Sequence, residues 1–192
     1  MTKEDEKMFE GNLDRSYVTT YYKRKFNPTR AVEKDITIGD VAHALSLICR
    51  ANGHLKIFFS VAQHSINCAL EAKERGLSTK IQLDCLLHDA SEAYIGDVIT
   101  PLKIQLNAYK DYENALQATV LKALGVEPPN EADVKVIKEI DSCMLYHEFK
   151  LLHGELLFKE EPKIHISINE NEIPHSEIEA QFIQIYRELK TY

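Results

Sequence analysis

The sequence predicts a single, mostly helical domain, and three observations support this class. At 192 residues the chain is long enough to bury one hydrophobic core. Its 44% hydrophobic and 28% charged residues are typical of a globular protein. Apolar residues recur at helical spacing over most of the chain, and no internal repeat or low-complexity stretch interrupts them. We therefore expect one all-α domain over residues 1–192, with a helical core over 36–152.

Three helices are expected in the first half of this core. Residues 37–51 carry apolar side chains at helical spacing. Residues 57–76 do the same, and Gly76 is a typical helix stop. Residues 78–94 begin at a Ser-Thr cap and continue through the stretch "CLLHDASEAY". Gly96 then interrupts the chain, and a new segment starts near Pro101.

Two long helices and a loop are expected in the second half. The helices cover about 106–124 and 131–152, and a long loop follows over 158–175. Within it, isoleucines alternate at positions 164, 166 and 168, which predicts a short strand or hairpin near 163–168. An amphipathic helix is expected over 176–190. The other helices do not require it, so its apolar face is available for a dimer interface.

The first 35 residues form a less regular N-terminal arm. Four basic residues gather there among aromatic side chains: Lys23, Arg24, Lys25 and Arg30. Two interpretations stay open, a solvated basic turn or an arm that faces a phosphate or another subunit. The N-terminus is too polar for a signal peptide, and no apolar run approaches the ~20 residues that span a bilayer. A cytoplasmic protein without membrane contact is expected.

Charge and cysteine usage exclude two further classes. The net charge of −7 argues against a broad surface for a nucleic-acid polymer. The four cysteines, Cys49, Cys68, Cys85 and Cys143, are widely spaced in apolar helical segments. We interpret them as buried reduced thiols, not as disulfides or zinc ligands.

The stretch "CLLHDASEAYIGD" changes abruptly from apolar residues to imidazole and carboxylate groups at His88, Asp89, Glu92 and Asp97. On a helix, His88 and Asp89 project about 100° apart, and Glu92 lies on the same side. Such groups bind a transition metal when they converge from rigid elements. One helix cannot complete the ligand shell, so other segments must contribute.

Two residues elsewhere are candidates for the missing ligands. His64 lies in an apolar helix without a local partner, and Asp141 lies next to a core-facing stripe. A buried carboxylate needs a partner, which makes Asp141 the more informative of the two. Together with His88 and Asp89 they form one two-histidine, two-carboxylate site from three helices.

The order His64, His88-Asp89, Asp141 resembles the H…HD…D signature of the HD-domain metal-dependent phosphohydrolases. The segment "HDASEAYIGDVITPLK" is similar to the corresponding part of bacterial HD-domain 5′-deoxynucleotidases. The upstream stretches "DVAHALSLICRANGH" and "FFSVAQHS" extend the likeness to about residues 20–150. The resemblance implies a single HD-domain helical bundle, and HD domains of this size often form homodimers.

The resemblance also implies a role for each site residue. The metal ligands would be His64, His88, Asp89 and Asp141. Glu92 and Asp97 would handle the attacking water and the leaving group, although Asp97 is equally suited to capping the next turn. Arg50 would grip the phosphate. His54 and Lys103 are either structural or face the substrate. Ala51 replaces a tryptophan that the deoxynucleotidases have at this place, which removes a ring that would sense the deoxyribose.

The expected activity is hydrolysis of a small-molecule nucleotide by water activated on one divalent ion of Mn, Co, Zn, Fe or Ni. A 5′-nucleotidase acting on ribo- or deoxynucleoside monophosphates and a nucleoside triphosphate triphosphohydrolase both fit. A guanosine polyphosphate (alarmone) hydrolase is an alternative within the same class. A nucleotide-binding HD module that signals without catalysis is the alternative outside it.

Overall fold

The computed structural model describes residues 16–191, and its architecture confirms the predicted all-α class. The α-helices are α2 (Ile38–Leu47), α3 (Val61–Glu74), α4 (Thr79–Leu87), α5 (Glu92–Ile95), α6 (Thr100–Lys103), α7 (Asn107–Ala123), α8 (Glu131–Leu152) and α9 (His175–Lys190). Strands β1 (Val18–Thr19) and β2 (Lys25–Phe26) form a small antiparallel hairpin. Short 3-10 turns occupy Pro28–Arg30, Glu33–Asp35 and Arg50–Gly53.

The helices begin and end where local chemistry predicts. Four N-cap side chains accept hydrogen bonds from backbone N–H groups in the first turn of their helix: Thr37, Ser60, Ser78 and Asn130. Gly76 and Gly125, the predicted stops after α3 and α7, have positive φ angles of 73° and 62°.

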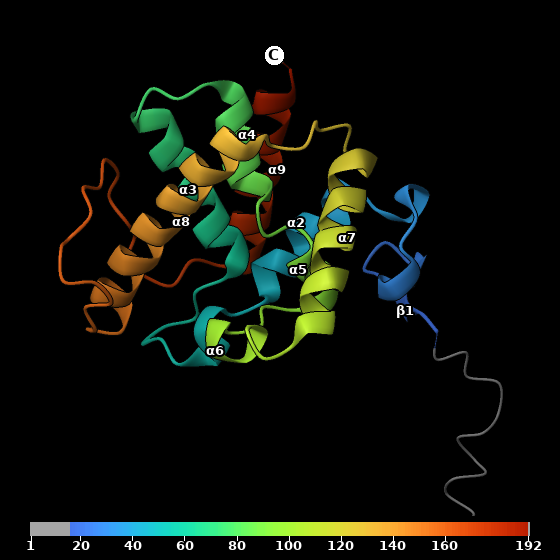
Figure 1. The fold of residues 1–192 in the computed structure, drawn as a ribbon, viewed down its shortest axis with the longest axis horizontal. Coiled ribbons are helices and arrows are strands. Elements are labelled where there is room, and N and C mark those ends of the chain that lie inside the picture. The colour runs from blue at the N-terminus through green and yellow to red at the C-terminus, as the bar shows by residue number, and fades with distance from the viewer. Residues whose placement is uncertain (1–15, 192) are drawn as a thin grey trace, which may run out of the picture.

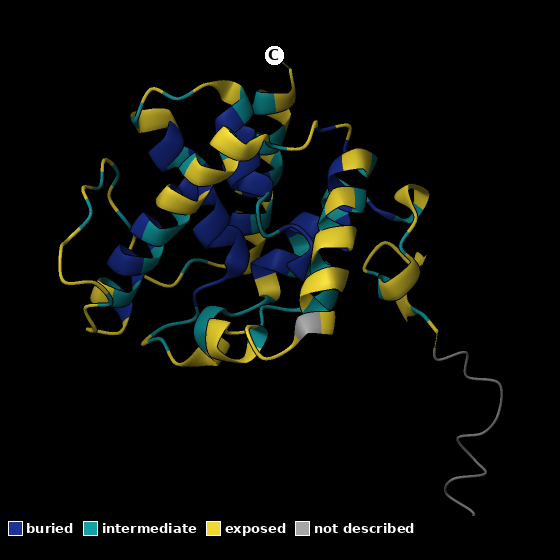
Figure 2. Cartoon of the chain, viewed as in Figure 1, coloured by how far each residue is buried: buried dark blue, intermediate teal, exposed yellow. Residues whose placement is uncertain are grey.

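Helices α3 and α4 lie side by side at the centre of the molecule, and α2, α8 and α9 pack around them (Figure 1). Their facing surfaces carry most of the buried residues, whereas the outer faces of α7 and α8 are exposed (Figure 2). Helix α9 packs against α2, α3 and α4, with Ile178 and Phe182 fully inside the core. The helix that we expected to be spare is therefore part of the hydrophobic core.

The described part of the N-terminal arm is ordered by contacts with the core. Phe26 is fully buried and stacks on Tyr94 at 4.0 Å between ring centroids. The Tyr22 backbone N–H donates to the buried Asp40 carboxylate at 2.9 Å. Lys23 forms the tip of the hairpin with a φ of 62°. The arm is thus a hairpin followed by 3-10 turns, and its first 15 residues lie outside the described part.

The predicted strand near 163–168 is wrong, although the alternation that suggested it is real. Ile164 and Ile166 pack against a core cluster of α3, α4 and α8, while His165 between them is exposed. The backbone N–H of His165 donates to the side chain of Glu71 at 2.8 Å. The segment alternates between buried and exposed residues without forming a strand, because the His165 N–H bonds to a carboxylate on α3 and not to another strand.

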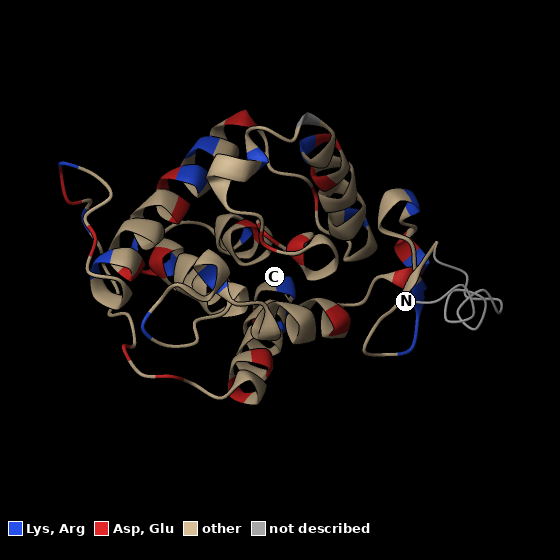
Figure 3. Ribbon diagram, turned by 90° about the horizontal axis from the view of Figure 1, so that it is seen from below, with Lys and Arg blue, Asp and Glu red and all other residues tan. Residues whose placement is uncertain are grey.

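Acidic and basic residues alternate along the exposed faces of the long helices (Figure 3). This agrees with a solvated surface without a broad face of one charge in the described part of the chain. Among residues 16–191, no helix combines the length and the apolar character that crossing a bilayer requires.

Candidate functional site

A cavity of about 520 Å³ brings together seven of the nine predicted site residues. They are Arg50, His54, Asp89, Glu92, Asp97, Lys103 and Asp141. His64 and His88 lie behind them, His64 with no exposed surface. Residues up to 91 positions apart in the chain therefore line one cavity. From the sequence, only their residue types suggested that they would come together.

The helix that carries His88 and Asp89 is not continuous, contrary to the expectation. Helix α4 ends at Leu87, residues 88–91 form tight turns, and α5 begins at Glu92. Within the turns the backbone N–H groups of Ala90 and Glu92 donate three residues back, at 3.0 Å each. The tighter winding changes the directions of the His88, Asp89 and Glu92 side chains from those of an α-helix.

Gln117 on α7 occupies this break. Its side-chain amide N–H donates to the Leu87 carbonyl at 2.7 Å, and its carbonyl accepts from the Ser91 N–H at 2.9 Å. In a continuous helix these two backbone groups would bond to each other. The amide of Gln117 therefore holds the turn open and fixes its shape. No feature of the local sequence around residue 117 signals this role.

The two imidazoles present the same ring nitrogen to the same place. His88 donates from Nδ1 to the Cys85 carbonyl at 2.7 Å, since a carbonyl only accepts, and this leaves Nε2 available. His88 Nε2 is buried and has no hydrogen-bond partner. It lies 3.1 Å from Asp89 Oδ2 and 3.8 Å from Asp141 Oδ1, while His64 Nε2 lies 3.0 Å from the same Asp141 oxygen.

Glu148 holds the other side of His64. Its two carboxylate oxygens lie 2.9 and 3.1 Å from His64 Nδ1, and it is 1% exposed. Asn67 donates to the same carboxylate at 3.2 Å. A carboxylate behind a histidine fixes the ring and makes it a stronger ligand. The sequence analysis missed Glu148, but it lies seven residues after Asp141, on the same face of α8, and that spacing is a usable signal.

The pKa values show that this wall favours a positive charge. Burial lowers the pKa of His88, but the Asp89 and Asp141 carboxylates outweigh it and raise that pKa well above its usual value. Burial acts in the opposite direction on Asp89, and the two imidazoles outweigh it and lower the pKa to about 2. The imidazoles lower the Asp141 pKa as well. Each group stabilises its charged partner, as expected for residues arranged around a cation.

Glu92 differs from these carboxylates because its surroundings favour the protonated form. It is 3% exposed, and burial together with the Asp89 and Asp97 charges raises its pKa to about 9. Its Oε2 atom is buried without a hydrogen-bond partner. Burial, helped by the Asp89 charge, also raises the pKa of Asp97. A buried acid with a raised pKa beside charged neighbours is typical of catalytic positions.

The two basic residues of the cavity, Arg50 and Lys103, differ in how closely they are paired with carboxylates. Arg50 lies 3.8 Å from Asp89 and 3.6 Å from Glu148, so its guanidinium has no tight partner among the carboxylates. Lys103 instead donates to Glu113 at 2.7 Å and lies 3.5 Å from Glu92. Arg50 is therefore better placed than Lys103 to contact a ligand.

The turn that follows Arg50 is strained. Ala51 and Asn52 both have left-handed backbone angles, with φ of 53° and 50°, and Gly53 continues at 78°. Ala51 and His54 line the cavity, and His54 is exposed. Strained turns of non-glycine residues persist where the surrounding structure holds them, often at binding sites.

The described residues contain a group able to hold a metal ion, His64, Cys68 and His88, whose ligand atoms all lie within 4.8 Å of one another. All four cysteines are free thiols, as predicted, but only Cys68, Cys85 and Cys143 are buried, whereas Cys49 is partly exposed. Cys68 was predicted to be a core thiol without a metal role, but its sulfur belongs to this group because it lies four residues after His64 on the same face of α3.

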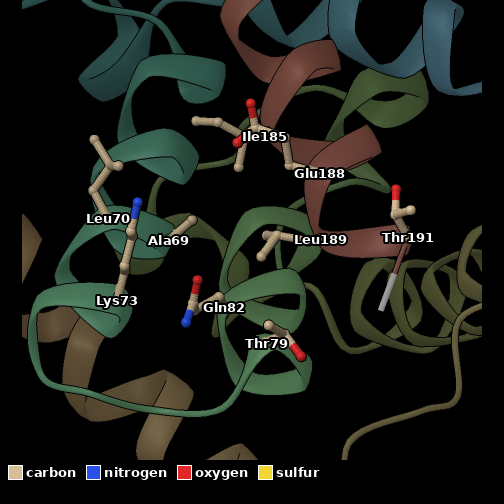
Figure 4. A pocket seen from close by; sticks show the side chains of 9 residues that line it. All are labelled: Ala69, Leu70, Lys73, Thr79, Gln82, Ile185, Glu188, Leu189 and Thr191. Atoms are coloured by element: carbon tan, nitrogen blue, oxygen red, sulfur yellow. The ribbon is translucent and has the colours of Figure 1, made fainter.

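A second cleft, of about 580 Å³, lies between α3, α4 and α9 (Figure 4). Its charged lining residues are Lys73 and Glu188, and neither histidine nor cysteine lines it. Although it is larger, this cleft lacks convergent ligand atoms and buried carboxyl groups. The cavity beside Asp89 is the candidate site on chemical grounds.

A comparison with models of known protein families finds no match. The chain is similar to the uncharacterized protein YfdR of Escherichia coli, with 36% identity over 120 residues. It is also similar to an uncharacterized protein of Rhodobacter capsulatus, with 34% identity over 126 residues. The aligned parts cover 62% of this chain and 65% and 64% of the two relatives, which is less than two thirds of either relative. The relatives thus share much of this sequence, and their names assign no activity.

Proposed function

We propose that the protein is a metal-dependent phosphohydrolase that acts on nucleotides, as its resemblance to HD-domain enzymes implies. One observation carries the proposal. Two imidazole nitrogens and two carboxylates converge on one wall of a cavity that also contains Arg50 and the buried acid Glu92. This combination offers a cation site, an anion contact and a proton acceptor within one cavity.

The residues that would hold the metal are His64, His88, Asp89 and Asp141. Two neutral imidazoles favour Mn, Fe, Co, Ni or Zn over Mg and Ca. A cation here would give the buried His88 Nε2 a partner and balance the carboxylates, which outnumber the basic residues of the cavity. When bound, such an ion supplies a Lewis acid for phosphate and lowers the pKa of water.

Three residues perform the remaining steps of the proposed reaction. Arg50 binds the non-bridging oxygens of the phosphate through its planar guanidinium. Glu92 in its ionised form accepts a proton from the attacking water at Oε2, and a divalent cation beside Asp89 would favour that form by offsetting the neighbouring carboxylate charge. Asp97 holds a proton for the leaving oxygen, in keeping with its raised pKa.

The remainder of the cavity suits the nucleoside part of a substrate. Apolar side chains also line the cavity: Val98, Ile99, Leu145, Phe149 and Leu157. A cavity of about 520 Å³ with a charged and an apolar side matches an amphipathic ligand such as a nucleotide. The 5′-nucleotidase and triphosphohydrolase alternatives share these features.

The test is hydrolysis of a panel of ribo- and deoxynucleoside mono- and triphosphates by protein loaded with Mn²⁺, Co²⁺ or Zn²⁺. Products are separated by ion exchange, and metal content is measured in parallel. We expect Asp89→Asn to lose both metal and turnover. The matched variant Asp111→Asn changes an exposed carboxylate on α7 and should retain both.

Each outcome distinguishes one alternative. Release of nucleoside from monophosphates identifies a nucleotidase, and release of tripolyphosphate identifies a triphosphohydrolase. Nucleotide binding without turnover in any metal form would contradict the proposed hydrolysis and favour a signalling module. An active Asp89→Asn protein with its full metal content would contradict the proposed ligand set.

A further inference from the structure

The thiol of Cys68 lies against the same imidazoles that the proposed metal site uses. Cys68 and His64 are four residues apart on α3, and the sulfur lies 3.5 Å from His64 Nε2. The ligand atoms of His64, Cys68 and His88 lie within 4.8 Å of one another. His88 Nε2 is buried there without a hydrogen-bond partner, a second sign that the group is incomplete.

The Cys68 sulfur and the Asp141 carboxylate both lie against His64 Nε2, at 3.5 Å and 3.0 Å, but the two side chains differ in exposure. Cys68 is 1% exposed and belongs to the apolar cluster between α3, α4 and α8. The side chains of Asp89 and Asp141 are 24% and 37% exposed and line the cavity. The two histidines therefore have one buried thiol and two partly exposed carboxylates as neighbours.

We propose that Cys68 is a ligand for thiophilic metal ions such as Zn²⁺ and Cd²⁺, which bind His64, Cys68 and His88 and so compete with ions bound through the carboxylates. The measured separation suits this role. A tetrahedral ion with bonds of about 2.0 Å to nitrogen and 2.3 Å to sulfur holds these atoms roughly 3.5 Å apart. Thiolate selects soft ions and carboxylate selects harder ones, so the protein has two overlapping ligand sets with different preferences.

Coordination through Cys68 forms a metal–sulfur bond and releases the thiol proton to solvent. A soft ion bound through the sulfur occupies the two imidazoles that the carboxylate ligand set needs, and its third bond goes to a buried atom that does not line the cavity. We therefore expect thiophilic ions to occupy the protein without supporting the reaction that harder ions support. This inference rests on the proposed function only through the two shared imidazoles.

The experiment titrates the full-length metal-free protein with Cd²⁺ and Co²⁺ and records the near-ultraviolet charge-transfer absorption of a metal–thiolate bond. We expect the band in the wild-type protein, its loss in Cys68→Ala, and its retention in Cys85→Ala. Cys85 is a matched control because it is equally buried in the same apolar cluster. The Cd²⁺ affinity of Cys68→Ala should fall at least about tenfold. Loss of a residue that only hydrogen-bonds to a metal ligand already has that effect, and Cys68 would be a ligand itself.

A second variant, Cys68→Ser, keeps the size of the side chain and covers the case in which the alanine variant misfolds. Metal binding without a thiolate band, or a band that survives both Cys68 variants, would overturn the inference and leave the proposed site intact. If neither Cd²⁺, Co²⁺ nor Mn²⁺ binds the wild-type protein, this inference and the proposed function fail together. Mn²⁺-dependent hydrolysis with no Cd²⁺ binding would refute the role of Cys68 alone.

Discussion

Two buried acidic clusters in this protein are built in opposite ways. Glu71 is fully buried and accepts hydrogen bonds from Arg75 at 2.8 Å and from His165 Nδ1 and N–H at 2.7 and 2.8 Å. Burial would raise its pKa, but these bonds outweigh burial and lower it. Arg75 also donates to Glu139 at 2.8 Å, so the cluster links α3, α8 and the loop before α9.

The cluster beside the cavity leaves polar atoms without partners. Glu92 Oε2 and His88 Nε2 are both buried without a hydrogen bond, and Glu92 has a pKa raised to about 9. An unsatisfied buried polar group destabilises the folded protein by about 1–3 kcal/mol. The comparison indicates that Glu71 stabilises the fold, whereas the Glu92 region is arranged for groups that bind from outside.

The largest expected effect separates catalysis from structure at Glu92. Glu92→Gln removes the proton acceptor but keeps the size of the side chain, so turnover should fall by about 10²–10⁴-fold. Metal content should stay unchanged, since Glu92 is outside the proposed ligand set. Steady-state kinetics and metal analysis on the same preparation measure both. Full turnover in this variant would contradict the role of Glu92 as the base.

At Glu71 the expected effect is on stability alone. Glu71→Ala leaves Arg75 Nε and the His165 N–H without their acceptor and should lower the free energy of unfolding by about 3 kcal/mol. Urea unfolding measures this, with Glu74→Ala as an exposed control on the same helix. Metal affinity of the folded protein should not change. A large loss of affinity would mean that the two clusters are coupled, which would break the comparison.

The pH dependence of stability should also distinguish the clusters. Glu92 binds a proton more tightly in the folded protein than in the unfolded chain, so it disfavours folding as pH rises from about 4.5 to about 9. The slope from this group approaches about 1.4 kcal/mol per pH unit. Glu92→Gln should remove that slope when wild-type and variant proteins are unfolded in a chelator at pH 6, 7 and 8. Equal slopes would show that Glu92 is ionised in the folded protein.

The sequence predicted most helix boundaries because they depend on neighbours in the chain. Ser78 caps α4 and Gly76 ends α3 through bonds within a few residues. The break after Leu87 was missed because it depends on Gln117, thirty residues away. The strand near 163–168 was wrongly predicted because its partner, Glu71, is 94 residues away. Local sequence patterns predict where helices end, but contacts between distant segments can override these patterns.

The candidate site follows the same division. Histidine and carboxylate residues stood out from their apolar surroundings, and the structure brings His64, His88, Asp89 and Asp141 together. Residues that hold these side chains in place did not stand out. Glu148 was detectable only through its helical spacing from Asp141. The role of Gln117, whose side chain replaces a backbone hydrogen bond between Leu87 and Ser91, cannot be inferred from the local sequence.

Gln117 offers a smaller test that concerns the shape of the His88–Asp89 turn. Gln117→Ala removes one of the two donors to the Leu87 carbonyl, leaves the Ser91 N–H without its acceptor, and should reduce metal affinity by about tenfold or more. Gln117→Glu keeps the acceptor for Ser91 and should recover part of the affinity. If both variants lose stability but bind metal as tightly as the wild-type protein, Gln117 supports only the fold and not the site.

The smallest expected effect concerns backbone strain at the cavity wall. Ala51 has a φ of 53°, a conformation that costs an alanine about 1–2 kcal/mol and glycine very little. Ala51→Gly should therefore raise the free energy of unfolding by roughly 0.5–1 kcal/mol, because relief of strain exceeds the added entropy of the unfolded chain. Ala115→Gly, at an exposed position inside α7, should lower it by about 1 kcal/mol. Opposite signs in urea unfolding would show that the cavity wall holds strain that an ordinary helix does not. The same sign at both positions would show that backbone strain does not distinguish the candidate site from the rest of the fold.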